Sequence, residues 1–396
     1  MRMLHTSDWH VGRTFHGANL LAEQEAILEH LADLVSAEAI DVVLVAGDIY
    51  DRAVPSADAV RVATRGLRRI REAGAQLVLT SGNHDSAARL GAFAEFAAAG
   101  GLHLRTSIDD PAGSAGLADP VLFDGGSAPV AVYGIPYLEP ETARRALGLE
   151  GPEQRGHAAV LTEAMRRVHA DLATRPEGTR SIVLAHAFVT GGMACDSERT
   201  IAVGGVEQVP GSVFAGIDYV ALGHLHGAQV LDDRLRYSGS PLAYSFSEAS
   251  QRKSVFLFDV DESGVSGIER RELPVPRRLA TVRGTLEELL ESPEHEDVTD
   301  CFVSATLTDR VRPVDAMRRL RERFPHAVHL DWEPEGRSEP VLRYAEAVRG
   351  RSDVDIARGF LDACRGAPPN EREDAWLVAA LESAGKHDPD QDGDVR

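Results

Sequence analysis

Five short apolar runs, each followed closely by residues that can bind a metal ion, constrain this chain more than any other feature of its sequence. The runs cover residues 3–7 before Asp8 and His10, 42–45 before Asp48, 77–79 before Asn83 and His84, 182–185 before His186, and 219–222 before His224 and His226. Short apolar segments beside turn residues are typical of buried strands. Ligands at the same end of neighbouring strands can converge, so we expect an α/β fold with one site at the strand ends.

The candidate ligands are Asp, Asn and His side chains, without a thiolate. This donor set favours two manganese-like ions over a structural zinc. One carboxylate can bridge two ions that lie about 3.5–4 Å apart, and Asp48 takes that central position. Two divalent ions would lower the pKa of a bound water and stabilise developing negative charge, and hydrolysis of a phosphodiester at neutral pH requires both.

The order of these motifs resembles that of the calcineurin-like metallophosphoesterases. The motifs are Asp-x-His at 8–10, Gly-Asp-x-x-Asp at 47–51, Gly-Asn-His-Asp at 82–85, the lone strand-end His186, and Gly-His-x-His at 223–226. The flanking segments 7–13 and 81–86 further resemble the SbcD family, the nuclease subunits of bacterial SbcC–SbcD DNA-repair complexes. The resemblance implies a calcineurin-like metallophosphoesterase sandwich of two mixed sheets flanked by helices, with a small α+β capping domain and C-terminal helices.

The chain has 396 residues, more than one core usually supports, and two prolines at 274 and 276 indicate a boundary. We expect a nuclease domain at 1–274, a DNA-binding capping domain at 275–340, a helix pair at 350–385 that docks on an ATPase partner, and a disordered acidic tail at 386–396. Helical spacing predicts helices over 20–38, 57–73, 157–173, 286–290, 313–324, 353–364 and 371–383. Further strands are expected over 130–135, 235–246, 253–261, 279–283, 301–307 and 328–332, and a loop over 107–129.

The resemblance also implies roles for individual residues. It places one ion on Asp8, His10, Asp48 and His226, and the other on Asp48, Asn83, His186 and His224. His84 would not bind metal; it would stabilise the transition state and donate a proton to the leaving oxygen, which suits the pKa range of histidine. Asp51 is expected to orient His84 in preference to Asp85, although relatives often carry histidine at the Asp51 position.

Contacts with DNA are predicted from arginines that follow the ligand motifs and from one polar segment. Arg13, Arg52 and Arg89 could meet phosphates through their guanidinium groups, with a solvated arginine as the alternative for each. The segment 237–241 resembles the rim of the site in the family, where Tyr237 and Ser240 would hold the DNA backbone. A basic helix face at 318–323 is a further candidate, and an ordinary solvated face is its alternative.

The composition is unusual for a protein that binds nucleic acid. The net charge is −20, from 42 basic and 62 acidic residues, whereas phosphate binding normally requires a basic surface. Metal ions or a basic partner would have to supply positive charge.

The three separated cysteines imply no disulfide framework, which is consistent with a reducing cytosol. We expect no signal peptide and no membrane span. Among the histidines that match no motif, His5, His16, His30, His103 and His157 are expected at the surface.

The function that the resemblance implies is that of a Mn²⁺-dependent DNA nuclease, with Mg²⁺ or another divalent ion as the alternative cofactor. Double-strand 3′→5′ exonuclease and single-strand endonuclease activities would serve DNA end and hairpin processing, repair and recombination. We expect a cytoplasmic, nucleoid-associated homodimer within a heterotetramer that includes an SbcC-like SMC-type ATPase. Two alternatives stay open: a phosphatase on the same fold, which would need neither the capping unit nor the helix pair, and a scaffold without activity.

Overall fold

A computed structural model of the chain describes residues 1–108, 116–126, 128–151, 154–198, 208–334, 350–365 and 367–384. The chain divides into two compact units, Met1–Arg277 and Arg278–Arg396. In the described part of the chain, no helix is long and apolar enough to cross a bilayer.

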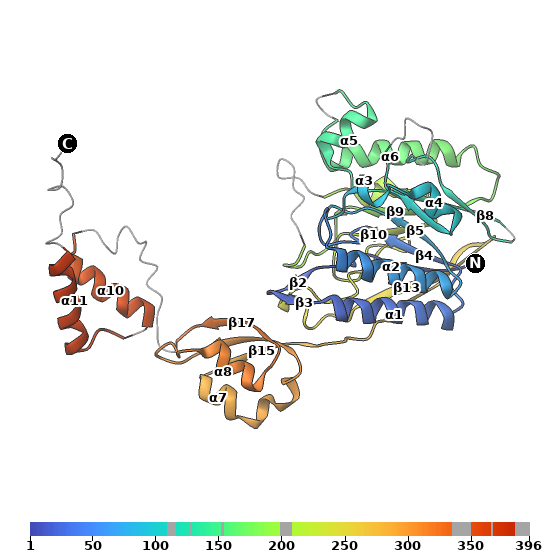
Figure 1. The fold of residues 1–396 in the computed structure, drawn as a ribbon. Helices are drawn as coiled ribbons and strands as arrows, with labels where there is room; N and C mark the ends of the chain where they lie inside the picture. The colour runs from blue at the N-terminus through green and yellow to red at the C-terminus, as the bar shows by residue number, and fades with distance from the viewer. Residues whose placement is uncertain are drawn as a thin grey trace, which may run out of the picture. The chain divides into compact units, whose positions relative to one another are not determined.

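The first unit contains two six-stranded sheets (Figure 1). The first sheet has the order β14 (Gly264–Glu272), β13 (Ser254–Asp261), β1 (Arg2–Thr6), β4 (Val42–Ala46), β5 (Gln76–Thr80) and β6 (Leu102–Arg105). The second has the order β11 (Gln229–Val230), β12 (Leu235–Tyr237), β10 (Tyr219–Gly223), β9 (Arg180–His186), β8 (Pro129–Ile135) and β7 (Val121–Asp124). Both are mixed, because β1 runs parallel to β4 but antiparallel to β13, and β8 runs parallel to β9 but antiparallel to β7. The predicted sandwich is confirmed.

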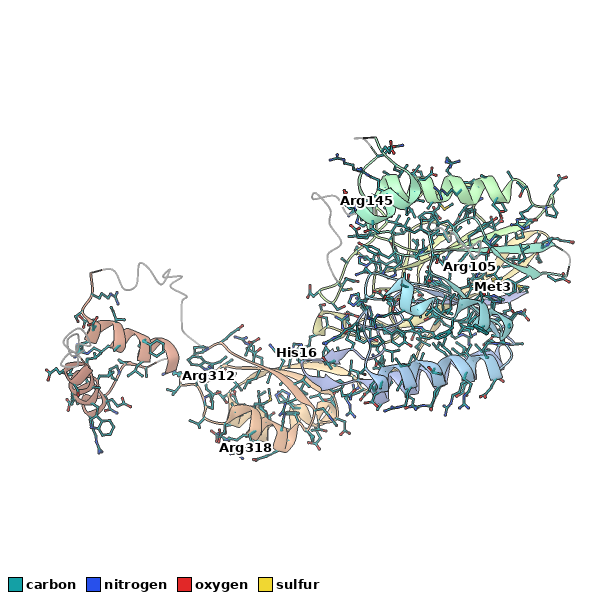
Figure 2. The ribbon with its side chains drawn as sticks, turned by 45° about the horizontal axis from the view of Figure 1, so that its top comes forward. Met3, His16, Arg105, Arg145, Arg312 and Arg318 are labelled. Atoms are coloured by element: carbon teal, nitrogen blue, oxygen red, sulfur yellow. The ribbon has the colours of Figure 1, made fainter. Side chains whose placement is uncertain are left out.

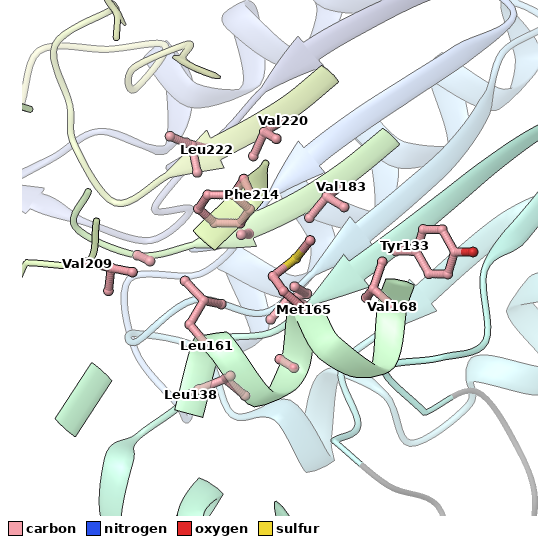
Figure 3. Packing of buried hydrophobic residues seen from close by; sticks show 14 of the residues in the cluster. Tyr133, Leu138, Leu161, Met165, Val168, Val183, Val209, Phe214, Val220 and Leu222 are labelled. Atoms are coloured by element: carbon pink, nitrogen blue, oxygen red, sulfur yellow. The ribbon is translucent and has the colours of Figure 1, made fainter. Parts of the chain in front are cut away.

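Helices cover the outer face of each sheet, which gives four layers (Figure 1). On the first sheet lie α1 (Leu21–Ala37) and α2 (Ala57–Glu72), and on the second lie α5 (Pro140–Leu147) and α6 (Gly156–Leu172). Figure 3 shows Leu161, Met165 and Val168 of α6 packed with Val183 and Val220 of the second sheet. Strands buried on both faces explain why the sequence shows continuous apolar runs rather than alternation.

A third apolar cluster fills the space between the two sheets. Its members come from strands of both sheets and include Met3, Leu44, Val78, Ile182, Leu184, Tyr219 and Phe258. The Tyr219 and Phe258 rings stack with centroids 4.1 Å apart. This shared core holds the two sheets together and therefore fixes the strand ends of one sheet against those of the other.

Shorter elements complete the first unit: β2 (Thr14–Phe15), β3 (Ala18–Asn19), α3 (Ala87–Leu90), α4 (Ala94–Ala99) and the 3₁₀ turns η1 (Gly211–Phe214) and η2 (Phe246–Glu248). The strand predicted over 235–246 is wrong beyond Tyr237, because Gly239 has a left-handed φ of 77° and Pro241 lacks an amide hydrogen. Strand β7 lies inside the segment predicted as a loop, and β14 was not predicted.

The second unit begins with a parallel three-stranded sheet in a βαβαβ arrangement, as predicted. Its elements are β15 (Leu279–Gly284), α7 (Leu286–Glu291), η3 (Pro293–Val298), β16 (Phe302–Leu307), α8 (Ala316–Arg323) and β17 (Ala327–Trp332). Thr285 starts α7 with a reciprocal capping box to Glu288. Leu289, Leu320 and Phe324 form a small core on the helical side of the sheet.

The last described elements are the helices α10 (Asp353–Arg365) and α11 (Glu371–Ala384), both predicted from the sequence. A forked ion pair joins them, with Arg358 Nε and Nη2 lying 2.5 and 2.7 Å from the two Asp374 carboxylate oxygens. The acidic tail predicted at 386–396 lies outside the described residues.

Two histidines that were expected at the surface, His5 and His157, are instead buried. The His5 ring lies between the sheets, with Nδ1 3.1 Å from the Tyr219 hydroxyl and Nε2 3.2 Å from the Leu222 carbonyl oxygen. The expectation was wrong for His5 because β1 belongs to a sheet that packs on helices with one face and on the second sheet with the other. It was wrong for His157 because this residue lies on the buried face of α6.

Burial of His5 makes the stability of the first unit sensitive to acid. Desolvation lowers the pKa of His5 from 6.5 to about 3 in the folded chain. Because the unfolded chain binds the His5 proton more readily than the folded chain, protonation favours unfolding. The free energy of unfolding therefore keeps its full value above pH 6.5 and falls as the pH drops from there toward 3. The slope of unfolding free energy against pH should therefore fall by up to about 1.4 kcal/mol per pH unit in His5→Gln.

Urea denaturation between pH 7 and 4 in the presence of a chelator measures this slope. His30→Gln on α1 provides the control, because His30 is partly exposed. An unchanged slope in His5→Gln would show that the native chain tolerates a protonated His5.

Candidate metal centre

The carboxyl ends of β1, β4, β5, β9 and β10 bring the predicted ligands together. Seven residues meet there: Asp8, His10, Asp48, Asn83, His186, His224 and His226. All of them are buried except Asn83, which is partly buried. The first three come from the first sheet and the last three from the second, so the site exists only where both sheets pack.

The first group of donors consists of Asp8, His10 and His226. One donor atom of each lies within 4.8 Å of the others. The Nε2 atoms of His10 and His226 are 3.0 Å apart. Two ligands at right angles on an ion with bonds of about 2.1 Å lie about 3.0 Å apart, so this separation fits a shared ion.

Asp48 lies between this group and a second one. Its Oδ2 atom is 3.6 Å from His10 Nε2 and 3.5 Å from His186 Nε2. In the second group, Asn83 Oδ1 is 2.9 Å from His186 Nε2 and 3.3 Å from His224 Nδ1. The structure thus places Asp48 where a single carboxylate would reach two ions.

Hydrogen bonds orient the ligands. His186 Nδ1 lies 3.0 Å from the Ala46 carbonyl oxygen, which can only accept, so Nδ1 carries the proton and Nε2 keeps its lone pair for a metal. The Asp8 carboxylate accepts from the His224 backbone amide at 3.0 Å and from the Ser7 hydroxyl at 2.5 Å.

The charge of the site also suits divalent cations. Burial lowers the pKa of His186 and of His226 to about 4, so both imidazoles are neutral ligands at pH 7. Burial and the nearby Asp48 carboxylate raise the pKa of Asp8 well above its ordinary value. Two buried carboxylates this close repel each other, and a dication between them reverses that repulsion. The residues therefore fit a pair of hard or borderline divalent ions.

Backbone geometry at the strand ends is tight and unusual. Four ligand residues have positive φ angles: Asp8 at 55°, His10 at 45°, Asp48 at 52° and His224 at 107°. A Cβ atom on Gly82 would lie 2.1 Å from Asp48 Oδ1, and one on Gly223 would lie 1.8 Å from the Ala46 carbonyl oxygen. These glycines are therefore required by close packing around the ligands, as the sequence indicated.

His84 lies beside the ligands but is held differently. Its Nδ1 is 2.8 Å from the backbone carbonyl oxygen of Asp51 and 3.7 Å from the Asp51 carboxylate. Asp51 thus contacts His84 mainly through its main chain, a detail that residue type could not predict. Asp85 instead accepts from three backbone amides, those of Ile49, Tyr50 and Gly82.

The predicted DNA contacts divide into two kinds. Tyr237 and Ser240 are fully buried, and their hydroxyls donate to the carbonyl oxygens of Ala187 and Leu242, so neither side chain can reach DNA. This part of the prediction is wrong, because both hydroxyls are buried and already bonded to the main chain.

The arginines lie nearer to the surface. Arg13 donates from Nη2 to the Ser197 carbonyl oxygen at 2.8 Å and lies over the Tyr244 ring. Arg52 and Arg89 are exposed. Arg318 of α8, labelled in Figure 2, is exposed but paired with Asp315 and Glu322. Contact of these arginines with DNA stays a prediction.

Sequence reasoning missed a set of polar residues behind His226: Ser197, Glu198, Glu248 and Lys253. None of them belongs to a ligand motif. One signal was present, since lysine occurs only at positions 253 and 386 and arginine supplies every other basic residue.

Comparison with known proteins adds two family matches and one distant structure. The calcineurin-like phosphoesterase family matches residues 1–228. The SbcD C-terminal domain family, described as type 5 capsule protein repressor C-terminal domain, matches residues 275–365. Among solved structures, a Thermus thermophilus sulfate thiohydrolase SoxB in complex with glycerol is 15% identical with a TM-score of 0.36. That alignment covers 69% of this chain and 56% of the SoxB chain.

Proposed function

Because the chain belongs to the calcineurin-like phosphoesterase family and also carries an SbcD-type C-terminal domain, we propose that it is a Mn²⁺-dependent DNA nuclease. The observation that carries this proposal is the buried Asp48 carboxylate, 3.6 Å from His10 Nε2 and 3.5 Å from His186 Nε2. Such an arrangement serves two-metal hydrolysis of a phosphodiester.

Two divalent ions would supply a water of lowered pKa and stabilise the charge that develops on the phosphate. Asp8, His10, Asp48 and His226 would hold one ion, and Asp48, Asn83, His186 and His224 the other. His84 would donate a proton to the leaving oxygen. Its Nδ1 faces the Asp51 carbonyl oxygen, an acceptor, so a neutral His84 keeps its proton there and needs a second proton on Nε2 to act as an acid.

The substrate decides between a nuclease and a phosphatase. The domain at 275–365 favours the nuclease, since it is the part of the chain that matches an SbcD family. Hydrolysis of labelled duplex DNA, single-stranded DNA and p-nitrophenyl phosphate esters, with Mn²⁺ and then with a chelator, tests this directly. Chelator-sensitive DNA cleavage supports the proposal, whereas hydrolysis of the small esters alone would identify a phosphatase. No metal-dependent cleavage of any substrate would favour a scaffold.

The helix pair is the proposed docking site for an SbcC-like ATPase. Phe360 of α10 and Trp376 of α11 have exposed fractions of 63% and 60%. Apolar side chains on amphipathic helices are suited to docking on a partner's helices. Truncation after Arg349 should therefore abolish co-purification with the ATPase and leave Mn²⁺-dependent cleavage of short single strands intact.

Two assays on the same truncated protein separate the outcomes. Tight association with the ATPase after truncation would contradict this interface. Loss of cleavage would indicate that the helices instead stabilise the rest of the chain.

A homodimer is proposed from exposed apolar residues at α4. Phe93 and Phe96 have exposed fractions of 73% and 80% and are three positions apart in the sequence. Two large exposed aromatic side chains this close form an apolar patch that can pack against the same patch of a second copy. Phe93→Glu with Phe96→Glu should weaken dimerisation by about 1,000-fold, because buried aromatic residues often contribute about 2 kcal/mol each.

Light scattering over a concentration series measures the dimer. Leu122→Glu on β7 is the matched control, since Leu122 is also exposed, at 54%. A double variant that dimerises as well as the control would exclude this patch as the interface.

A further inference from the structure

A buried ion pair lies behind His226, outside the set of candidate ligands. The Lys253 ammonium contacts the Glu248 carboxylate, and their side chains are 4% and 0% exposed. Lys253 Nζ also lies 3.0 Å from Gln251 Oε1 and 3.1 Å from the Ser240 hydroxyl. Burying two charges costs free energy, which their attraction offsets only when hydrogen bonds complete the arrangement, as they do here.

A serine connects this ion pair to the imidazole ring. Ser197 Oγ lies 2.5 Å from His226 Nδ1 and donates to Glu248 Oε1. Since the hydroxyl hydrogen goes to Glu248, the hydroxyl can only accept from the ring, so His226 Nδ1 must carry the ring proton. The Nε2 atom then keeps a free lone pair, on the side where His10 Nε2 lies 3.0 Å away.

The main chain of His226 is held by the same groups. Its amide donates to Glu198 Oε1 at 2.6 Å, and its carbonyl oxygen accepts from Lys253 Nζ at 3.0 Å. Lys253 therefore contacts the backbone of the ligand directly, while Glu248 acts on the ring through Ser197. These contacts fix the orientation and the tautomer of the His226 ring and the position of its backbone.

The choice of lysine at 253 supports a specific role. Lysine occurs at only two positions in the sequence, whereas arginine supplies the remaining basic residues. An ammonium is a compact charge whose three hydrogens can point to separate oxygens, whereas the planar guanidinium of arginine prefers a forked carboxylate. The oxygens around Lys253 come from four residues: His226, Ser240, Glu248 and Gln251.

We propose that Glu248 and Lys253 are a positioning pair that holds His226 as a metal ligand, Glu248 through Ser197 and Lys253 through the His226 carbonyl oxygen. Neither residue touches substrate, and their contribution is to the affinity of one of the two ions. This inference rests on the proposed metal centre. Groups that orient a metal-binding histidine commonly affect metal affinity by about 10–100-fold.

The test is a Mn²⁺ titration of the metal-free full-length protein, in which the EPR signal of free Mn²⁺ reports binding. Wild type should bind two ions. Glu248→Gln should weaken one of them about 10–100-fold and leave the other within about threefold. Ser197→Ala should weaken the same ion without leaving a buried charge unpaired. Glu272→Gln, which breaks an exposed ion pair with Arg252, should bind like wild type.

Three further outcomes are informative. Lys253→Arg should bind one Mn²⁺ ion more weakly than wild type, although the positive charge is kept. Wild-type affinity for both ions in that variant would overturn the role assigned to the ammonium. Unchanged affinity for both ions in Ser197→Ala and in folded Glu248→Gln would overturn the positioning pair alone. A wild-type protein that binds no Mn²⁺ would overturn the metal centre and this inference together.

Discussion

His84→Gln should keep both Mn²⁺ ions and lose about 10²–10⁴-fold of its DNA cleavage rate, the usual contribution of a general acid. Glutamine preserves the backbone amide that donates to Asp48 Oδ1 at 2.8 Å, so the loop stays in place. What it removes is a group that can release a proton to the leaving oxygen near neutral pH. Elemental analysis of the purified variant and single-turnover cleavage of a labelled single strand measure the two parts of this expectation.

The metal analysis is decisive because geometry alone allows a second role for His84. One donor atom each of His84, His10 and Asp48 lies within 4.8 Å of the others. Loss of an ion from His84→Gln would therefore reassign His84 as a ligand. His103→Gln on β6 serves as the control, and it should match wild type in both metal content and rate.

Asp48→Ala should lower the occupancy of both ions together and abolish cleavage. The carboxylate lies between the two ligand groups, so its removal takes one donor from each ion. It also lowers the negative charge of the candidate ligand set, in which Asp8 would be the one remaining carboxylate to balance two dications. A Mn²⁺ titration with a count of bound ions gives the result.

Asn83→Ala is the matched comparison for Asp48→Ala. Asn83 Oδ1 approaches His186 and His224, which are both assigned to the same ion, so this variant should weaken mainly that ion. Tight binding of two equivalents of Mn²⁺ by Asp48→Ala would exclude a bridging role. Equal loss of both ions in the two variants would show that the sites fill cooperatively rather than separately.

The ligand strands were predictable because their chemistry is local. Each apolar run ends within a few residues of its ligand, and β1, β4, β5, β9 and β10 all form where the runs lie. A strand whose sheet is covered by helices on one face and by a second sheet on the other needs apolar residues on both faces, which makes it easy to recognise from sequence. The second unit was predictable for a different reason, since its helices have regular apolar spacing and short connections.

What the sequence could not predict depends on contacts between distant segments. Ser197 follows β9, whereas Glu248 and Lys253 lie in the connection between β12 and β13, and the two segments meet because the two sheets pack together. The same limit explains Tyr237, which was expected at the rim of the site from the family resemblance but whose hydroxyl donates to the Ala187 carbonyl oxygen. Residue type predicts the chemistry that a side chain can perform, whereas burial depends on the rest of the fold.

The positive φ angles of the candidate ligand residues should make the lifetime of the protein depend on its metal supply. Asp and His tolerate this conformation better than most residues, yet each such residue costs on the order of 1 kcal/mol, and His224 at φ 107° lies outside the favoured region. A chain without metal bears that cost in full, together with the repulsion between buried carboxylates. Ions that bind only the folded chain offset it by mass action. A cell starved of the metal would therefore lose this enzyme to proteolysis as well as to inactivity, and its abundance would follow the available ion.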